Sequence, residues 1–145
     1  MIKLKDYETI GLCHGCFDLF HYGHLLHFQE AKKNCDYLIV SITSDSFLNK
    51  ECGRPIFTAI ERKAIIESIK PVDKAIISNS FTGLEVLKEI KPSIFFKGID
   101  YSSSQDTRYI SEVEFCKKIN CKIHITKSPK LSTTDFIKKC KDVIF

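Results

Sequence analysis

The sequence has few of the residues that mark fibrous, disordered or membrane-spanning chains. Glycine (6) and proline (4) together occupy only ten of the 145 positions, while 43% of the residues are apolar and 28% are charged. These values are ordinary for a globular protein. The longest uninterrupted apolar runs are a handful of residues, so no membrane-spanning helix is predicted. The Lys-rich start has no apolar stretch behind it, so we expect no secretory signal and a cytoplasmic protein. The length predicts a single domain over residues 1–145.

The excess of basic over acidic residues is also small. Lys and Arg number 22 against 18 Asp and Glu, a net charge of +4. This is too little to predict nucleic-acid binding, but it suits a small anionic substrate. The seven cysteines are an odd number, and we expect most of them to be reduced core residues. A zinc-binding module is the non-enzymatic alternative, with Cys13 and Cys16 as a C-x-x-C pair and Cys116, Cys121 and His124 as the second half.

Short apolar runs alternate with helical patterns along the chain. The runs that predict strands are Thr9–His14, Tyr37–Thr43, Lys74–Ser78, Ser93–Lys97 and Lys122–Thr126. Helices are predicted over Gly23–Asn34 and Thr133–Val143, and after three capping-box sequences that begin at Thr58, Thr82 and Ser111. Five strands alternating with five helices predict an α/β fold, with a parallel sheet between two helical layers. In such sheets ligands bind beyond the carboxyl ends of the strands.

The most informative segment follows the first predicted strand, where residues 14–24 read HGCFDLFHYGH. His21 and His24 are three positions apart at a predicted helix start, so their side chains point to the same side. The unpaired N–H groups and the positive dipole end of a helix start favour phosphate, and Gly23 leaves room for a ligand at the backbone. The segment therefore predicts a phosphate site, with a loop carrying two surface histidines as the ordinary alternative.

With Gly15-Cys-Phe-Asp18 before it, His21-Tyr-Gly-His24 resembles the HxGH signature of the cytidylyltransferase-like nucleotidyltransferases. Leu131-Ser-Thr-Thr134 resembles the second signature of that family, ISTT, at the start of the last helix. The resemblance covers about residues 10–139. It implies a small Rossmann-like three-layer domain with a five-stranded parallel sheet. It also implies transfer of a nucleoside monophosphate from a nucleoside triphosphate to a phosphorylated acceptor, with release of pyrophosphate.

The middle of the chain resembles the sugar-phosphate branch of this family, the ADP-heptose synthase type. Its segments are residues 53–56 (GRPI), 61–62 (ER), 72–73 (VD) and 97–101 (KGIDY), the last with Ile99 where that branch has a second glycine. The resemblance implies ATP or CTP as donor, a phosphorylated sugar or polyol as acceptor, and a place in activated (heptose-type) sugar or cell-surface polysaccharide biosynthesis. A CTP:glycerol-3-phosphate cytidylyltransferase is the second candidate, although residues 127–130 (KSPK) replace its usual RTEG. A protein that keeps the fold without the activity, as a nucleotide-binding sensor or a scaffold, is a third candidate.

The resemblance also implies roles for individual residues. His21, His24 and Lys50 are the expected catalytic residues, and Lys50 and Arg62 are expected to bind the acceptor. His14 departs from the small or amide residue usual before the GxFD string, which makes it a further candidate for acceptor binding. Asp18 is the candidate ligand for the expected Mg²⁺ cofactor. A homodimer is expected, with Val72-Asp73 in its contact segment. The residues expected to bind the nucleotide are Gly15, Cys16, Phe17, Asp18, Gly23, Lys97, Gly98, Asp100, Tyr101, Lys127, Ser132, Thr133 and Thr134.

Overall fold

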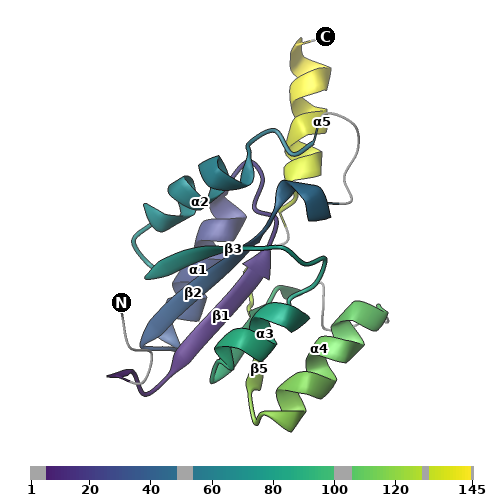
Figure 1. Ribbon diagram of the computed structural model, residues 1–145. Coiled ribbons are helices and arrows are strands. Elements are labelled where there is room, and N and C mark those ends of the chain that lie inside the picture. The colour runs from purple at the N-terminus through teal and green to yellow at the C-terminus, as the bar shows by residue number, and fades with distance from the viewer. Residues whose placement is uncertain (1–5, 49–53, 100–105, 129–130, 145) are drawn as a thin grey trace.

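The computed structural model describes residues 6–48, 54–99, 106–128 and 131–144. Strands and helices alternate along the chain, as the sequence predicts (Figure 1). The strands are β1 (Ile10–Gly15), β2 (Tyr37–Thr43), β3 (Lys74–Ser78), β4 (Ile94–Lys97) and β5 (Lys122–Ile125). The helices are α1 (Tyr22–Lys33), the short 3-10 helix η2 (Asp45–Phe47), α2 (Ala59–Glu67), α3 (Leu84–Ile90), α4 (Thr107–Lys118) and α5 (Thr133–Ile144).

All five strands are parallel, in the order β3-β2-β1-β4-β5. The predicted α/β fold with a five-stranded parallel sheet is therefore confirmed. Strand order reverses between β1 and β4, because the chain moves from β1 outward to β2 and β3 and then crosses to β4. In open parallel sheets, ligands bind beyond the carboxyl ends of the strands at this kind of reversal. The end of β1 and the end of β4 are thus the positions that the fold offers to a ligand.

Two apolar clusters cover the two faces of the sheet. One contains Phe28 of α1 and Ile66 of α2, and the other contains Leu87 of α3 and Cys116 of α4. Every residue of β2 is buried, as expected for a central strand covered on both faces. Helix α5 differs from the others because it has no buried residue and projects from the body of the protein in Figure 1.

The predicted capping boxes have different outcomes. The box at α2 is confirmed, since the Thr58 side chain accepts a hydrogen bond from Glu61 N and the Glu61 side chain accepts one from Thr58 N. The prediction at Ser111 is wrong. Helix α4 begins one turn earlier, where the Asp106 carboxylate accepts a hydrogen bond from Arg108 N. The Ser111 hydroxyl lies inside the helix and donates to Thr107 O, four residues back.

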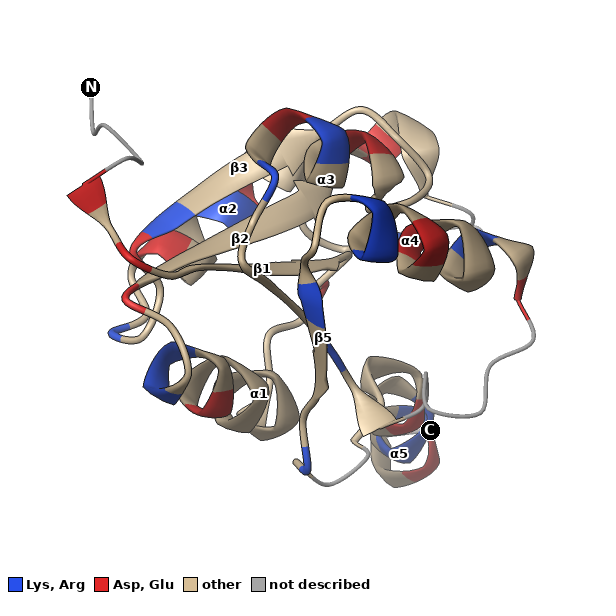
Figure 2. Ribbon diagram, turned by 90° about the horizontal axis from the view of Figure 1, so that it is seen from below, with Lys and Arg blue, Asp and Glu red and all other residues tan. Residues whose placement is uncertain are grey.

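Acidic and basic residues are interspersed over α1, α3, α4 and α5 (Figure 2), so neither sign of charge dominates these helices. Within the described ranges, no helix combines the length and the apolar character that crossing a bilayer requires. The Val72-Asp73 segment makes contacts within its own chain. The Asp73 carboxylate accepts hydrogen bonds from Lys32 Nζ at 2.6 Å and from Leu38 N at 2.7 Å. The expected homodimer stays a prediction.

Candidate nucleotide and acceptor site

Two cavities open at the carboxyl edge of the sheet. The first, which we call the histidine cavity, has a volume of about 380 Å³ and is lined by the ends of β1 and β4 and the first turns of α1 and α5. The second, which we call the α4 cavity, has a volume of about 310 Å³ and lies against α4. Both are lined by His14, Gly15, Cys16 and Lys97. The sheet thus places two adjoining cavities at the reversal of strand order.

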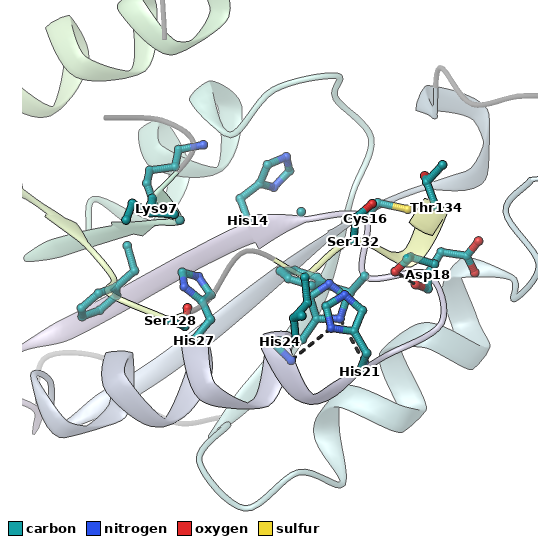
Figure 3. A pocket seen from close by; sticks show the side chains of 18 of the residues that line it. His14, Cys16, Asp18, His21, His24, His27, Lys97, Ser128, Ser132 and Thr134 are labelled. Atoms are coloured by element: carbon teal, nitrogen blue, oxygen red, sulfur yellow. Dashed lines mark hydrogen bonds between the residues drawn. The ribbon is translucent and has the colours of Figure 1, made fainter. Parts of the chain in front are cut away.

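His21 and His24 form a stacked pair at the start of α1, with ring centroids 3.7 Å apart (Figure 3). His21 caps the helix, because its Nδ1 accepts a hydrogen bond from Gly23 N at 3.1 Å. His24 Nδ1 accepts one from His21 N at 3.3 Å. Since both Nδ1 atoms are acceptors, the proton of each neutral ring is assigned to Nε2. This histidine pair therefore presents two Nε2–H donors.

Electrostatics keep these rings neutral. Burial lowers the pKa of His24 to about 3, and the neighbouring His21 and His27 add to the shift. Burial likewise lowers the pKa of His21. His21 Nε2 is buried and has no hydrogen-bond partner among the described residues. An unpaired buried donor is costly, which makes this atom the clearest sign that the cavity takes an acceptor-rich ligand such as phosphate.

The first turn of α5 closes the opposite side of the histidine cavity. Ser132, Thr133 and Thr134 line it, and the Thr133 hydroxyl donates to Asp18 O at 3.0 Å. A Cβ on Gly23 would lie 3.0 Å from His21 Cε1 and 3.1 Å from Leu131 Cβ, so a larger residue would have to displace these neighbours at the two helix starts. The two predicted signature segments, far apart in the sequence, therefore meet in one cavity.

Asp18 lines the histidine cavity, but its carboxylate is bonded to other parts of the protein. Its Oδ2 accepts hydrogen bonds from Arg54 Nε and Ile56 N, both at 2.9 Å, and its Oδ1 accepts one from Phe57 N at 3.1 Å. Burial alone would raise the pKa of Asp18, but these three donors together hold it below its ordinary value. Asp18 is the only carboxylate among the described residues that line the histidine cavity. Because its oxygens are already bonded, it does not fit the expected role of magnesium ligand.

The position of Arg62 also differs from the prediction. The sequence predicts an acceptor-binding arginine, but the Arg62 side chain is fully buried and lines neither cavity. Its guanidinium donates to four acceptors, which are the carbonyl oxygens of Phe57, Cys16 and Thr43 and the carboxylate of Asp45. Asp45, Arg62, Asp18 and Arg54 form what we call the arginine cluster. It fixes the loop after β1 against α2, so Arg62 supports the site from behind.

The α4 cavity contains polar residues of several elements. It is lined by His14, Gly15, Cys16, Thr43, Phe47, Leu48, Phe81, Thr82, Lys97, Asp106, Arg108, Tyr109 and Glu112. His14 Nδ1 lies 3.0 Å from the Ser41 hydroxyl. Burial, together with the charge of Lys97, lowers the pKa of His14 to about 4, so this ring is also neutral. The predicted acceptor-binding residue His14 thus lines both cavities.

The remaining predicted residues fall into three groups. Phe17, Gly98 and the residues already described line the histidine cavity as expected. Lys127 is exposed and does not line it; its backbone N–H donates to Glu30 Oε1 at 2.9 Å. Lys50, Asp100 and Tyr101 lie outside the described residues. Sequence reasoning missed His27, although it follows His24 at the same three-residue spacing, and it missed Glu112, which gives no local signal.

The zinc-binding alternative is wrong. Cys13 belongs to the apolar cluster beside α1 and α2, whereas Cys116 and Cys121 belong to the cluster on the other face of the sheet. No group of His, Cys, Asp or Glu residues within the described ranges could hold a metal ion. The two cysteines of the C-x-x-C pattern have different surroundings, because Cys13 is buried in β1 and Cys16 follows the end of that strand.

Comparison with curated proteins finds longer relatives, each with one region that is similar to this chain. It is 31% identical over 138 residues to the bifunctional protein HldE of Campylobacter fetus, a match that covers 92% of this chain and 28% of that protein. It is 31% identical over 143 residues to the bifunctional protein HldE of Helicobacter pylori, covering 97% of this chain and 30% of that protein. The chain thus spans less than a third of the length of these relatives.

Solved structures share the fold over most of the chain. A lipopolysaccharide core biosynthesis protein from Thermoplasma volcanium is 31% identical, with a TM-score of 0.68 over 84% of this chain and 98% of that one. A pantoate-beta-alanine ligase from Francisella tularensis, at 18% identity and a TM-score of 0.63, shows the fold alone, over 99% of this chain and 72% of that one. Residues 12–139 match the profile of the family described as cytidylyltransferase-like. The chain that joins the HxGH and STT segments in one cavity therefore belongs to the cytidylyltransferase-like family.

Proposed function

We propose that the protein is a nucleotidyltransferase that transfers a nucleoside monophosphate from ATP or CTP to a phosphorylated sugar or polyol and releases pyrophosphate. The observation that carries the proposal is the histidine pair, whose rings line a cavity closed by the start of α5 and whose bonded Nδ1 atoms leave Nε2 as the donor. The name of the Thermoplasma relative, a lipopolysaccharide core biosynthesis protein, favours a heptose-type acceptor for cell-surface sugar biosynthesis.

In the proposed reaction, the triphosphate occupies the histidine cavity and the acceptor occupies the α4 cavity. A phosphate oxygen of the acceptor attacks the α-phosphorus and forms a new P–O bond. The bond from the α-phosphorus to the oxygen that bridges to the β-phosphorus breaks, and that oxygen leaves with the electron pair as part of pyrophosphate. The acceptor phosphate is ionised, so no proton transfer is needed. Such chemistry depends on positioning and charge stabilisation rather than on a protein nucleophile.

The residues of this chain supply the positioning. His21 and His24 would donate to triphosphate oxygens and stabilise the charge that grows on them in the transition state. Being neutral, the two rings are donors without bringing a second buried charge into the cavity. Ser132, Thr133 and Thr134 would bind the same phosphates from the first turn of α5. Magnesium commonly accompanies nucleoside triphosphates, but since Asp18 does not fit as its ligand, we assign no step to a metal.

Two measurements test this function. A thermal-shift series with ATP, CTP, GTP and UTP identifies the donor, because a ligand of the folded state raises its apparent stability. Pyrophosphate release is then measured with that donor and with heptose-1-phosphate, other sugar phosphates or glycerol-3-phosphate. Turnover with CTP and glycerol-3-phosphate alone would identify the alternative cytidylyltransferase. Nucleotide binding without pyrophosphate release from any acceptor would contradict the proposed enzyme and leave a nucleotide-binding sensor.

A further inference from the structure

Lys97 lies on the wall between the two cavities. It is the last residue of β4, and its side chain is only 5% exposed. Figure 3 shows Lys97 and His14 on one side of β1, and the three histidines of α1 on the other. Of the four described residues that line both cavities, His14 is neutral and Gly15 and Cys16 carry no cationic group. Lys97 is therefore the cation that the two cavities share.

Glu112 of α4 fixes that cation in place. Its Oε2 lies 2.9 Å from Lys97 Nζ, and both side chains are at least 95% buried. Its Oε1 accepts a hydrogen bond from Gly83 N at 2.8 Å. The Phe95 ring supports the ammonium from another direction, with its centroid 4.6 Å from Nζ. One carboxylate thus connects α4, the end of β4 and the start of α3.

The surroundings of Glu112 leave it little freedom to move. Its side chain is only 4% exposed, and a Cβ on Gly83 would lie 3.0 Å from Glu112 Oε1, so the carboxylate packs closely against the backbone at Gly83. A buried ion pair is a poor source of stability, because the cost of removing two charges from water offsets their attraction. A pair of this kind at the wall of a ligand cavity therefore calls for a role beyond folding.

The proposed transfer reaction gives the Lys97–Glu112 pair such a role, and this inference rests on that proposed function. Two anions meet in the transfer, the α-phosphate of the nucleotide in the histidine cavity and the phosphate of the acceptor in the α4 cavity. They repel each other unless a positive charge lies between them. We infer that Lys97 bridges these two phosphates as a catalytic residue, and that Glu112 is the positioning residue that holds its ammonium at the shared wall.

The inference predicts separate effects on binding and on turnover. Lys97→Met removes the bridging charge, and we expect kcat to fall at least about a hundredfold. Glu112→Gln keeps an oxygen for Gly83 N but loses the charge that fixes Lys97, and we expect kcat to fall by at least about tenfold. The dissociation constant of the nucleotide, measured by calorimetry, should change less than threefold in Glu112→Gln, a limit on the order of 0.7 kcal/mol, because the histidine pair is untouched. Glu114→Gln, an exposed change on the same helix, is the matched control and should behave as wild type.

The double variant separates positioning from folding. If Glu112 acts through Lys97, adding Glu112→Gln to Lys97→Met lowers kcat no further, whereas independent roles give multiplied losses. A Glu112→Gln protein that melts at a lower temperature but turns over at the wild-type rate once folded would overturn the inference and leave the proposed function intact. If the wild-type protein itself releases no pyrophosphate from any donor and acceptor, the proposed function fails and the inference fails with it.

Discussion

The arginine cluster and the histidine pair lie at the same edge of the sheet but differ in how their polar atoms are bonded. In the arginine cluster, the guanidinium of Arg62 donates to four acceptors and the carboxylate of Asp18 accepts three hydrogen bonds. In the histidine pair, both Nδ1 atoms are bonded, while His21 Nε2 is buried and unpaired among the described residues. A saturated cluster holds the fold together, whereas an unpaired donor on a ring that lines a cavity is a candidate for contact with a ligand.

The strongest test of the saturated cluster is Arg62→Met. Removing one partner leaves buried acceptors without a donor, so we expect the free energy of unfolding to fall by about 3–5 kcal/mol. Urea denaturation measures the loss, with the half-exposed neighbour Lys63→Met as the control. Turnover per folded molecule should remain close to wild type. A stable Arg62→Met protein that no longer binds its acceptor would show that Arg62 contacts substrate after all.

The matching test of the unsaturated pair is His24→Ala. Loss of one donor aimed at developing charge commonly costs about 3 kcal/mol of transition-state stabilisation, so we expect kcat to fall at least about a hundredfold. Steady-state pyrophosphate release measures this effect. Tyr22→Ala is the control, because Tyr22 is 64% exposed, belongs to the same helical turn and does not line the cavity. Wild-type turnover in His24→Ala would remove the histidine pair from the mechanism.

Acidification should destabilise the protein through its buried histidines. Burial is the main cause that lowers the pKa of His24 to about 3, and of His14 and His27 to about 4. In the unfolded chain a histidine has a pKa near 6.5, so below that pH the unfolded state binds protons that the folded state does not. Their contribution to stability is complete above about pH 6.5 and is lost as the pH falls toward 4.

Between pH 6.5 and pH 5 the loss is up to about 2 kcal/mol for each histidine that stays neutral in the fold. Thermal denaturation at a series of pH values measures it. His27→Gln removes one of the three groups, so its melting temperature should fall less on acidification than that of wild type. An identical pH dependence in the two proteins would mean that His27 is protonated in the folded state.

The smallest expected effect concerns the helix that carries Arg62. Thr58→Ala removes the side-chain acceptor of the α2 capping box and should cost about 1 kcal/mol of folding stability. Differential scanning calorimetry would detect the corresponding decrease of a few degrees in Tm. Because the cap is remote from both cavities, kcat should not change. A large loss of turnover would show that the arginine cluster transmits small movements of α2 to the site.

The fold was predictable because its signals are local. The nearly continuous apolar, β-branched run of β2 and the reciprocal box of Thr58 and Glu61 each specify an element without reference to the rest of the chain. The position of the histidine pair was predictable for the same reason, since residue spacing and glycine usage determine it. The prediction that a helix begins at Ser111 was wrong because Asp106 and Ser111 can both cap a helix start, and Asp106 comes first in the chain.

The roles of Arg62, Asp18 and Glu112 were not predictable from local patterns. Each depends on partners distant in the sequence: Arg62 on Cys16 and Thr43, Asp18 on residues 54–57, and Glu112 on Gly83 and Lys97. A sequence motif shows which residue types are present, but whether an arginine faces substrate or the protein interior depends on long-range packing. The same packing decides which of the cysteines share a face of the sheet.

The position of α5 has a consequence for the timing of events at the site. Its first two residues and the preceding Ser132 line the histidine cavity, yet no residue of the helix is buried. A triphosphate that contacts the start of α1 on one side and the start of α5 on the other would therefore hold α5 against the rest of the protein. Amide hydrogens of the helix should then exchange slowly with deuterium while nucleotide is present and quickly once pyrophosphate has departed. Release of the product would then coincide with the loss of the contacts that hold α5 in place.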